Sequence, residues 1–279
     1  MVLPSFIRNL LIAAASTAAG FAAEPVPARI VFQNGKSLPI TAVALQGEKL
    51  VSTTTAEGFR DKQILPPASH VYGDKPAEIN QALAILLFDR EKAKEVQKLL
   101  EPVVKEHRVT AKISGNFWIE AAKILMLAYA LDYDTGSCTT LGKELSDATP
   151  AQGTDPMVAL CRAVMVSPLA KLEERDAALR DQTTDNLPAD VCAYASFFRG
   201  DLFVKEKKPP LALDAYLKVS CLYPSGGRVL IAASEIRAAD LLSAAGKREE
   251  ALALVNSAMR GATGTILVDE VNKRLESLK

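Results

Sequence analysis

The chain carries two histidines, the side chains that most often act as general acids, general bases or metal ligands near neutral pH. They are His70 and His107. The sequence predicts a loop around His70 and a helix end at His107, and neither residue belongs to a metal-binding pattern such as H-E-x-x-H. We therefore expect both histidines to lie on the surface, and we expect no bound metal.

Phosphate chemistry would require a glycine-rich loop in front of a helix. The nearest approach is the stretch 136–144, GSCTTLGKE. It has one residue too many between its glycines, and Glu144 stands where a Ser or Thr would hold magnesium. We interpret this stretch as a helix connection. Since no nucleophile motif such as G-x-S-x-G is present either, nothing in the sequence supports catalysis or a cofactor.

The composition is that of an ordinary folded protein. Of 279 residues, 49% are hydrophobic and 24% are charged, which argues against a disordered chain. Lys and Arg together number 33, as do Asp and Glu. A neutral chain has no electrostatic footprint for nucleic acid. Aromatic residues make up only 6%, which suits closely packed helices better than a β-sandwich.

The first 22 residues have the pattern of a secretory signal peptide. Arg8 gives a positive start, 10–19 is a short apolar run, and Gly20-Phe21-Ala22 offers small residues for cleavage. The alternative is a membrane anchor, but the run is shorter than the roughly 20 residues that span a bilayer. No Cys precedes Cys138, which argues against a lipoprotein anchor. We expect an exported protein, periplasmic or secreted, with no transmembrane segment after signal cleavage.

Residues 28–65 have the pattern of a small β-meander. Asn34-Gly35 is a strong hairpin signal. The predicted strands are 28–33, 36–40, 41–45, 49–53 and the short 63–65. About 40 residues make a weak core on their own, so we expect the meander to lean on the first helices. It would serve as a structural cap or, less simply, as a binding surface.

From residue 76 onward the apolar residues follow the helical period. Short connectors favour antiparallel pairs, and Pro102 is expected to kink its helix or end it early. The predicted helices are 76–88 with 91–107, 117–133 with 138–146, 156–166 with 169–181, a pair within 190–222, 228–245 with 247–260, and a final helix 265–278.

One stretch, 190–224, carries a recognisable spacing. Gly200 is followed by Phe203, then by Ala212 and Tyr216, and Pro224 ends the unit. Small residues at the crossing let two helices approach, and the aromatic side chains fill the space between them. This stretch resembles the helix–turn–helix unit of tetratricopeptide repeats.

The resemblance departs from the family pattern at two positions. Ser196 and Arg199 stand where the family usually has a large aromatic residue and a Leu. The resemblance implies a mainly α protein of the bacterial cell envelope, a right-handed TPR-like α-solenoid of about five helix pairs spanning 76–279, with the small N-terminal β-meander in front of it. The alternative is an irregular helical bundle.

The resemblance also implies a partner-binding groove, because the first helix of each pair lines the concave surface in that family. On the best-matching pair these positions are Tyr194, Phe197, Asp201, Val204 and Lys205. The aromatic residues could anchor an apolar side chain, and Asp201 with Lys205 suits a peptide backbone. The alternative is that the aromatics pack on the next repeat and the polar pair is merely solvated.

The four cysteines are too dispersed for C-x-x-C zinc or redox motifs. In an exported protein they could pair. An antiparallel hairpin would bring Cys192 near Cys221, and neighbouring helices would bring Cys138 near Cys161. The alternative is four reduced, buried thiols.

Together these observations predict a non-catalytic, exported scaffold that binds a protein or peptide partner. Two other functions stay open: an envelope hydrolase that acts on cell-wall material, and a structural subunit that self-associates into a homo-oligomer.

Overall fold

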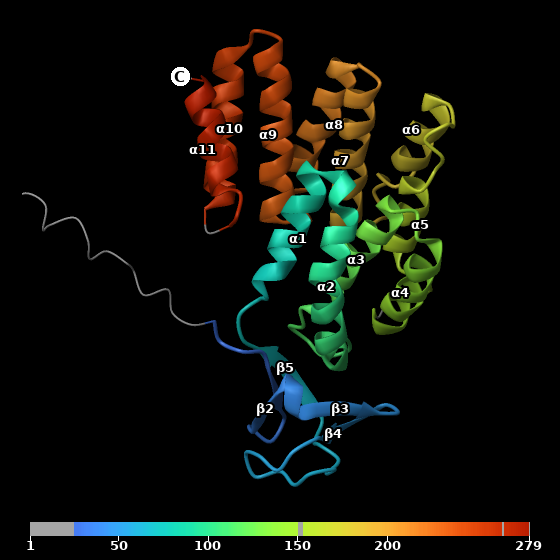
Figure 1. Cartoon of the computed structure of the whole chain (residues 1–279), viewed down its shortest axis with the longest axis vertical. Coiled ribbons are helices and arrows are strands. Elements are labelled where there is room, and N and C mark those ends of the chain that lie inside the picture. The colour runs from blue at the N-terminus through green and yellow to red at the C-terminus, as the bar shows by residue number, and fades with distance from the viewer. Residues whose placement is uncertain (1–24, 150–152, 264, 279) are drawn as a thin grey trace, which may run out of the picture.

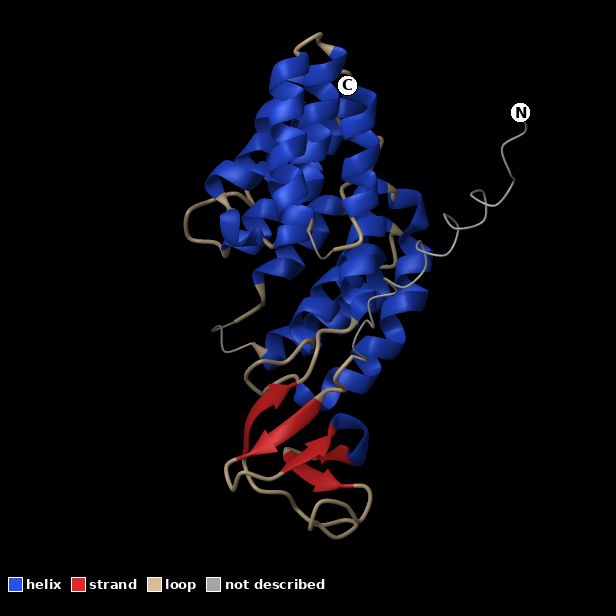
Figure 2. Ribbon diagram, turned by 90° about the vertical axis from the view of Figure 1, so that its left-hand side faces the viewer, coloured by secondary structure: helices blue, strands red, loops and turns tan. Residues whose placement is uncertain are grey.

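The computed structural model describes residues 25–149, 153–263 and 265–278. The predicted signal peptide, 1–22, lies outside the described residues. Within them the protein is mainly helical, and a small layer of strands lies at one end of the helical part (Figures 1 and 2).

The strands form two antiparallel units rather than one meander. β1 (Arg29–Phe32) lies between β2 (Ser37–Pro39) and β5 (Ala68–Tyr72), while β3 (Val43–Gln46) pairs with β4 (Lys49–Ser52). The hairpins predicted from the sequence are confirmed.

The end predicted for the β part, residue 65, was wrong. β5 follows the two prolines at 66 and 67 and returns to pair with β1. The stretch 63–65 lies along β4 through a bridge between Val51 and Ile64, and the Leu65 amide donates to the carbonyl of Leu50 at 2.9 Å. In β5 only Val71 is buried, so the sequence lacks the alternation of buried apolar and exposed polar residues that would have marked a strand.

The strand layer has its own small core, and it leans on the helices as expected. Phe32 and Phe59 meet edge to face with ring centroids 5.4 Å apart. Ile113, from the connection between the second and third helices, is buried in the same cluster. The Val71 amide also donates to the carbonyl of Ser114, at 2.9 Å. The connection around 113–114 therefore joins the two parts.

Across the residues that the structure describes, the helices follow the predicted order, as five pairs and a final helix. Pro102 lies inside the second helix without ending it. The bounds are α1 Ala77–Phe88, α2 Ala93–His107, α3 Trp118–Leu131, α4 Thr135–Ala148, α5 Pro156–Val164, α6 Leu172–Arg180, α7 Ala189–Lys205, α8 Pro209–Leu222, α9 Arg228–Ala244, α10 Arg248–Ala262 and α11 Val268–Leu278.

The crossing of α7 and α8 has the tight packing that the spacing predicts. A Cβ atom placed on Gly200 would lie 2.5 Å from Cε1 of Tyr216, far inside van der Waals contact. Ala212 is fully buried at the same crossing. The absence of a side chain at position 200 therefore lets the Tyr216 ring pack directly on α7.

The first helices of the five pairs form a closed ring. α1 packs against α3, α3 against α5, α5 against α7 and α7 against α9, and α9 packs back against α1. In an open solenoid each repeat contacts only its sequence neighbours. Because the first and fifth pairs meet, the faces that would line a long concave surface are buried in one continuous core.

The two histidines differ in their exposure to solvent. His70 lies in β5 and is exposed, whereas His107, at the end of α2, is buried. The surface position predicted for His107 was therefore wrong. The start of α3 covers this end of α2, and the His107 ring meets Phe117 edge to face, with centroids 6.1 Å apart.

Candidate functional site

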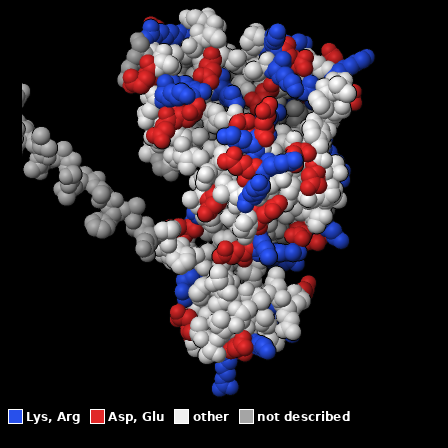
Figure 3. Space-filling view, viewed as in Figure 1, with Lys and Arg blue, Asp and Glu red and all other residues white. Residues whose placement is uncertain are grey.

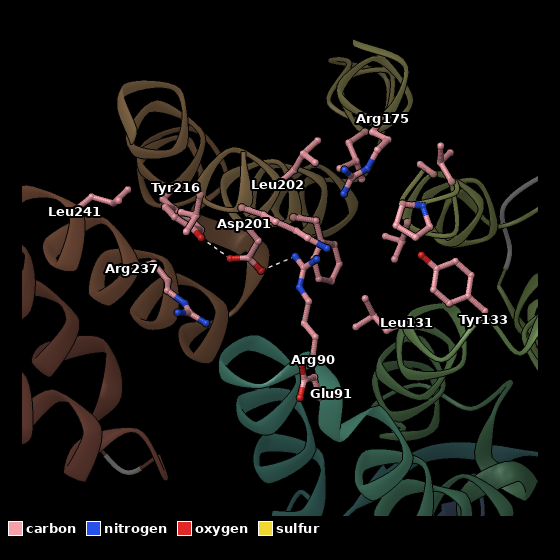
Figure 4. A pocket seen from close by; sticks show the side chains of 18 of the residues that line it. Arg90, Glu91, Leu131, Tyr133, Arg175, Asp201, Leu202, Tyr216, Arg237 and Leu241 are labelled. Atoms are coloured by element: carbon pink, nitrogen blue, oxygen red, sulfur yellow. Dashed lines mark hydrogen bonds and ion pairs between the residues drawn. The ribbon is translucent and has the colours of Figure 1, made fainter. Parts of the chain in front are cut away.

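A cavity of about 610 Å³ opens at the end of the ring where the first helices finish (Figure 4). Its walls come from the C-terminal halves of α3, α5, α7 and α9, from the turn that follows α1, and from residues of α6 and α8. Three residues predicted for the partner groove line it: Asp201, Val204 and Lys205.

The other two predicted groove residues lie elsewhere. Phe197 is fully buried, with its ring 5.4 Å from the Tyr216 ring and 6.1 Å from that of Phe198. Tyr194 lines a second cavity at the opposite end of the ring. The five residues therefore do not share one surface, because closure of the ring places the middle of α7 inside the core.

Asp201 holds the floor of the cavity together. Its Oδ1 accepts a hydrogen bond from the hydroxyl of Tyr216, and its Oδ2 forms an ion pair with Arg90 (Figure 4). Burial and the negative charge of Asp201 raise the pKa of Tyr216 far above its ordinary range, so the phenol stays protonated and donates. Asp201 is thus a fixed structural acceptor rather than a solvated groove residue.

Two arginines that the sequence analysis missed complete the floor. The Arg90 guanidinium lies 4.6 Å from the ring centroid of Phe198. Arg237 lies 5.3 Å from that of Phe88 and donates to the carbonyl oxygens of Leu87 and Phe88 at 3.1 and 3.2 Å. These carbonyls end α1, where a cation also favours the helix dipole. No local spacing marks either arginine, since their partners are more than 100 residues away.

The rim of the cavity exposes apolar side chains. Tyr133 and Val204, which line it, are 50% and 45% exposed, and Leu169, next to the lining residue Pro168, is 95% exposed. Lys205 has no ion-pair partner among the described residues, whereas Arg175 is paired with Glu206 at 3.2 Å. Exposed apolar side chains next to a lysine without an ion-pair partner are typical of ligand-binding pockets.

Three carboxylates line the cavity, those of Glu91, Asp201 and Asp240, and two of them are paired with cations. Asp201 is paired with Arg90, and Asp240 lies 3.4 Å from Arg274. Across the described residues, no three His, Cys, Asp or Glu side chains gather in a way that could hold a metal ion.

Comparisons with known proteins leave the family open. No family model, no curated protein and no solved structure matches the chain. The likeness of 190–224 to a tetratricopeptide unit therefore stays a resemblance, and the function rests on the structure.

The surface shows mixed charge on the face seen in Figure 3, where Lys and Arg alternate with Asp and Glu over the helical part. In the part of the chain that the structure describes, no helix is both long enough and apolar enough to cross a membrane.

All four cysteines are free thiols. Sγ of Cys192 lies 3.7 and 3.8 Å from the carbonyl oxygens of Thr184 and Leu187, in the connection before α7, while Cys221 is exposed at the end of α8. The predicted Cys192–Cys221 bridge is not formed, because Cys192 is turned toward that connection.

The second predicted pair is better placed. Cys138 in α4 and Cys161 in α5 are both buried, and these two helices pack against each other. Burial raises the pKa of Cys161 well above its ordinary value, and the neighbouring Cys138 thiol adds to this shift. They are reduced neighbours here, so their oxidation stays a prediction.

Proposed function

We propose that the protein is an exported, non-catalytic scaffold of TPR-like helix pairs that binds a peptide segment of a partner protein at the cavity where its first helices end. The observation that carries the proposal is the rim of this cavity. Half-exposed Val204 and Tyr133 line it, and nearly fully exposed Leu169 lies beside it. Gathered exposed apolar side chains beside a cavity are typical of binding sites rather than of inert surface.

The charges favour a segment that combines an apolar and an acidic side chain. Lys205 has no ion-pair partner among the described residues and lies next to the apolar Val204. The floor is already ordered by the contacts of Asp201 with Arg90 and Tyr216. A pre-ordered floor lowers the entropy cost of binding.

Two parts of this proposal, export and the likeness to tetratricopeptide repeats, are supported by sequence patterns. The pattern of 1–22 supports a secreted protein, and the crossing of Gly200 with Tyr216 supports TPR-like pairing for α7 and α8. In place of an open right-handed solenoid, the proposed array is one whose end pairs meet.

Displayed peptide libraries, selected on the purified protein, test the proposal. Selected peptides should bind the wild type and lose affinity roughly tenfold or more for Val204→Glu, because the new carboxylate would be desolvated against the apolar rim and would repel an acidic peptide. The matched control is Leu222→Glu, at a residue that is 59% exposed on α8 and does not line the cavity. Equal binding to both variants would sink the proposal.

Self-association through the same rim is a separate outcome. Sedimentation equilibrium of the wild type would then show a mass that rises with concentration, and Val204→Glu would return it to that of one chain. In that case the occupant of the rim is a second copy of this chain, and a foreign peptide partner is rejected.

A further inference from the structure

A second cavity, of about 540 Å³, lies at the opposite end of the ring, where first helices begin. Residues at or near the starts of α1, α3, α7 and α9 line it. They include Asn80 of α1, Glu120 of α3, Asp190 and Tyr194 of α7, and Arg228 of α9.

The start of α9 leaves its first amides without a cap. The residue before the helix is Gly227, with φ of +100°, and no side chain caps the helix. The first amide that bonds back is that of Ile231, which donates to the Gly227 carbonyl. Free amides and the helix dipole make such a terminus attractive to an anion.

The loop before α9 is fixed against α7. A Cβ atom on Gly226 would lie 2.6 Å from Cβ of Ala193, so this glycine lets the loop pack on α7. A Cβ atom on Gly227 would meet nothing within 4 Å, and Ser225 is exposed beside it. The loop therefore presents the helix start to open space in the cavity.

Tyr194 supplies an independent observation. The surrounding helices bury Tyr194, which is only 5% exposed, and the residue lines this cavity. Among the described residues its hydroxyl has no hydrogen-bond partner. Glu120 and Asp190 line the same cavity. Burial, followed by the charges of these two residues, raises the pKa of Tyr194, so the phenol stays protonated and can donate. A phenol in such a position lacks an acceptor.

The acidic residues do not repel an anion here, because each is paired. Lys75 Nζ lies 2.5 Å from Oε1 of Glu120, and Lys123 Nζ lies 2.6 Å from Oδ2 of Asp190. With Arg228, three cations face two carboxylates, an excess of one positive charge among the lining residues. Arg228 donates to the carbonyl of Thr263 through one Nη atom.

We infer that this cavity binds an oxyanion, the phosphate or carboxylate group of a small ligand. The donors are the free amides at the start of α9, the hydroxyls of Ser225 and Tyr194, and the guanidinium of Arg228. The site lies at the other end of the ring from the proposed peptide cavity, so either assignment can fail without the other.

Titration of the purified protein with inorganic phosphate tests the inference, with sodium chloride at matched ionic strength as the reference. We expect saturable shifts of the Arg228 and Val229 amide signals in NMR spectra and a rise in melting temperature. Acetate forms a second arm, and the tighter of the two anions identifies a phosphate or a carboxylate ligand. No saturation by either anion overturns the inference.

Two variants distinguish a built site from an adventitious ion. Tyr194→Phe removes one donor and should weaken binding roughly fivefold. Ser225→Asp supplies its own carboxylate to the start of α9, so it should abolish the shifts while leaving the fold intact. Ser243→Asp makes the same charge change at an exposed position near the other end of α9 and should bind as the wild type does.

Wild-type affinity in both Tyr194→Phe and Ser225→Asp would mean an adventitious ion only and would reject the site. If Tyr194→Phe does not fold, Ser225→Asp decides alone, because its side chain is at the surface.

Discussion

Arg90 forms an ion pair with Asp201, 111 residues further along the chain. The pair joins the turn after α1 to the last part of α7. Arg237 adds a second tie, from α9 to the carbonyls that end α1. The two ends of the helical array are therefore held together by side chains that also form the floor of the candidate peptide cavity.

Replacing Asp201 by Ala should destabilise the protein by about 1–3 kcal/mol. The change leaves the Tyr216 hydroxyl and the Arg90 guanidinium without their acceptor, and unpaired buried donors cost free energy. Urea unfolding followed by circular dichroism measures the loss. Asp214→Ala breaks an exposed i,i+4 pair with Lys218 and should cost less than about 0.5 kcal/mol. Similar losses in the two variants would contradict the role of Asp201.

Gly200→Ala should cost about 1–3 kcal/mol, because the new Cβ would lie 2.5 Å from the Tyr216 ring and overpack the crossing. Thermal unfolding gives the measurement. The control is Gly136→Ala in the first turn of α4, where the nearest atom is 3.6 Å away, so alanine should be neutral or slightly stabilising. A melting temperature unchanged at position 200 would show that α8 can withdraw freely.

Stability should fall on acidification because of His107. Burial lowers its pKa below the ordinary 6.5, although the charges of Glu106 and Glu78 oppose the shift. The unfolded chain then binds more protons than the folded one below about 6.5, so stability is full above that pH. It is lost as pH falls from 6.5 toward the lowered pKa.

The difference between wild type and His107→Gln isolates this effect in urea titrations at pH 7.5, 6.5 and 5.5. The slope between pH 6.5 and 5.5 should be smaller in the variant, and an identical slope would reject the assignment.

The buried Glu235 changes stability with pH in the opposite direction to His107. Burial raises the pKa of Glu235, so its contribution to stability is present below its ordinary value of 4.5 and is lost as pH rises through the raised value.

Oxidation of the protein should join Cys138 to Cys161 and leave Cys192 and Cys221 free. The first two thiols are both buried, on helices that pack against each other, and the closed loop would contribute about 3 kcal/mol in the chain-entropy estimate. Peptide mapping without reductant, on protein recovered after export, identifies the linkage. Four free thiols, or a bridge that involves Cys192, would contradict the expectation.

Export predicts a processed N-terminus. The protein recovered from outside the cytosol should lack about 22 residues by intact-mass measurement. A full-length chain confined to the cytosol would reject the signal peptide at 1–22, and with it the reason to expect a disulfide.

The helix pairs could be predicted from sequence because each is marked locally. Apolar residues at the helical period mark one face of α2 and of α11, and Gly, Pro or short polar connectors separate the pairs. β5 could not be predicted in this way, since Val71 is its buried residue and its pairing with β1 spans some 40 residues of chain.

The candidate site was predictable only in part, for the same reason. Asp201, Val204 and Lys205 were placed at a cavity by the likeness of α7 to a repeat helix. The burial of Phe197 and the roles of Arg90 and Arg237 depend on which distant helices meet, and local periodicity carries no information about that. The apolar surface on almost every side of α3 was the available signal that its neighbours would surround it.

Because α9 packs back on α1, the number of helix pairs in this protein is set by its geometry. An open array can gain or lose a unit at its end during evolution, and its terminal units can fray separately. A closed array of five has no free end at which either change is harmless, since an added pair would force every neighbour apart. Such a molecule should melt as one cooperative unit, and its relatives should vary in loop length while keeping the same count of pairs.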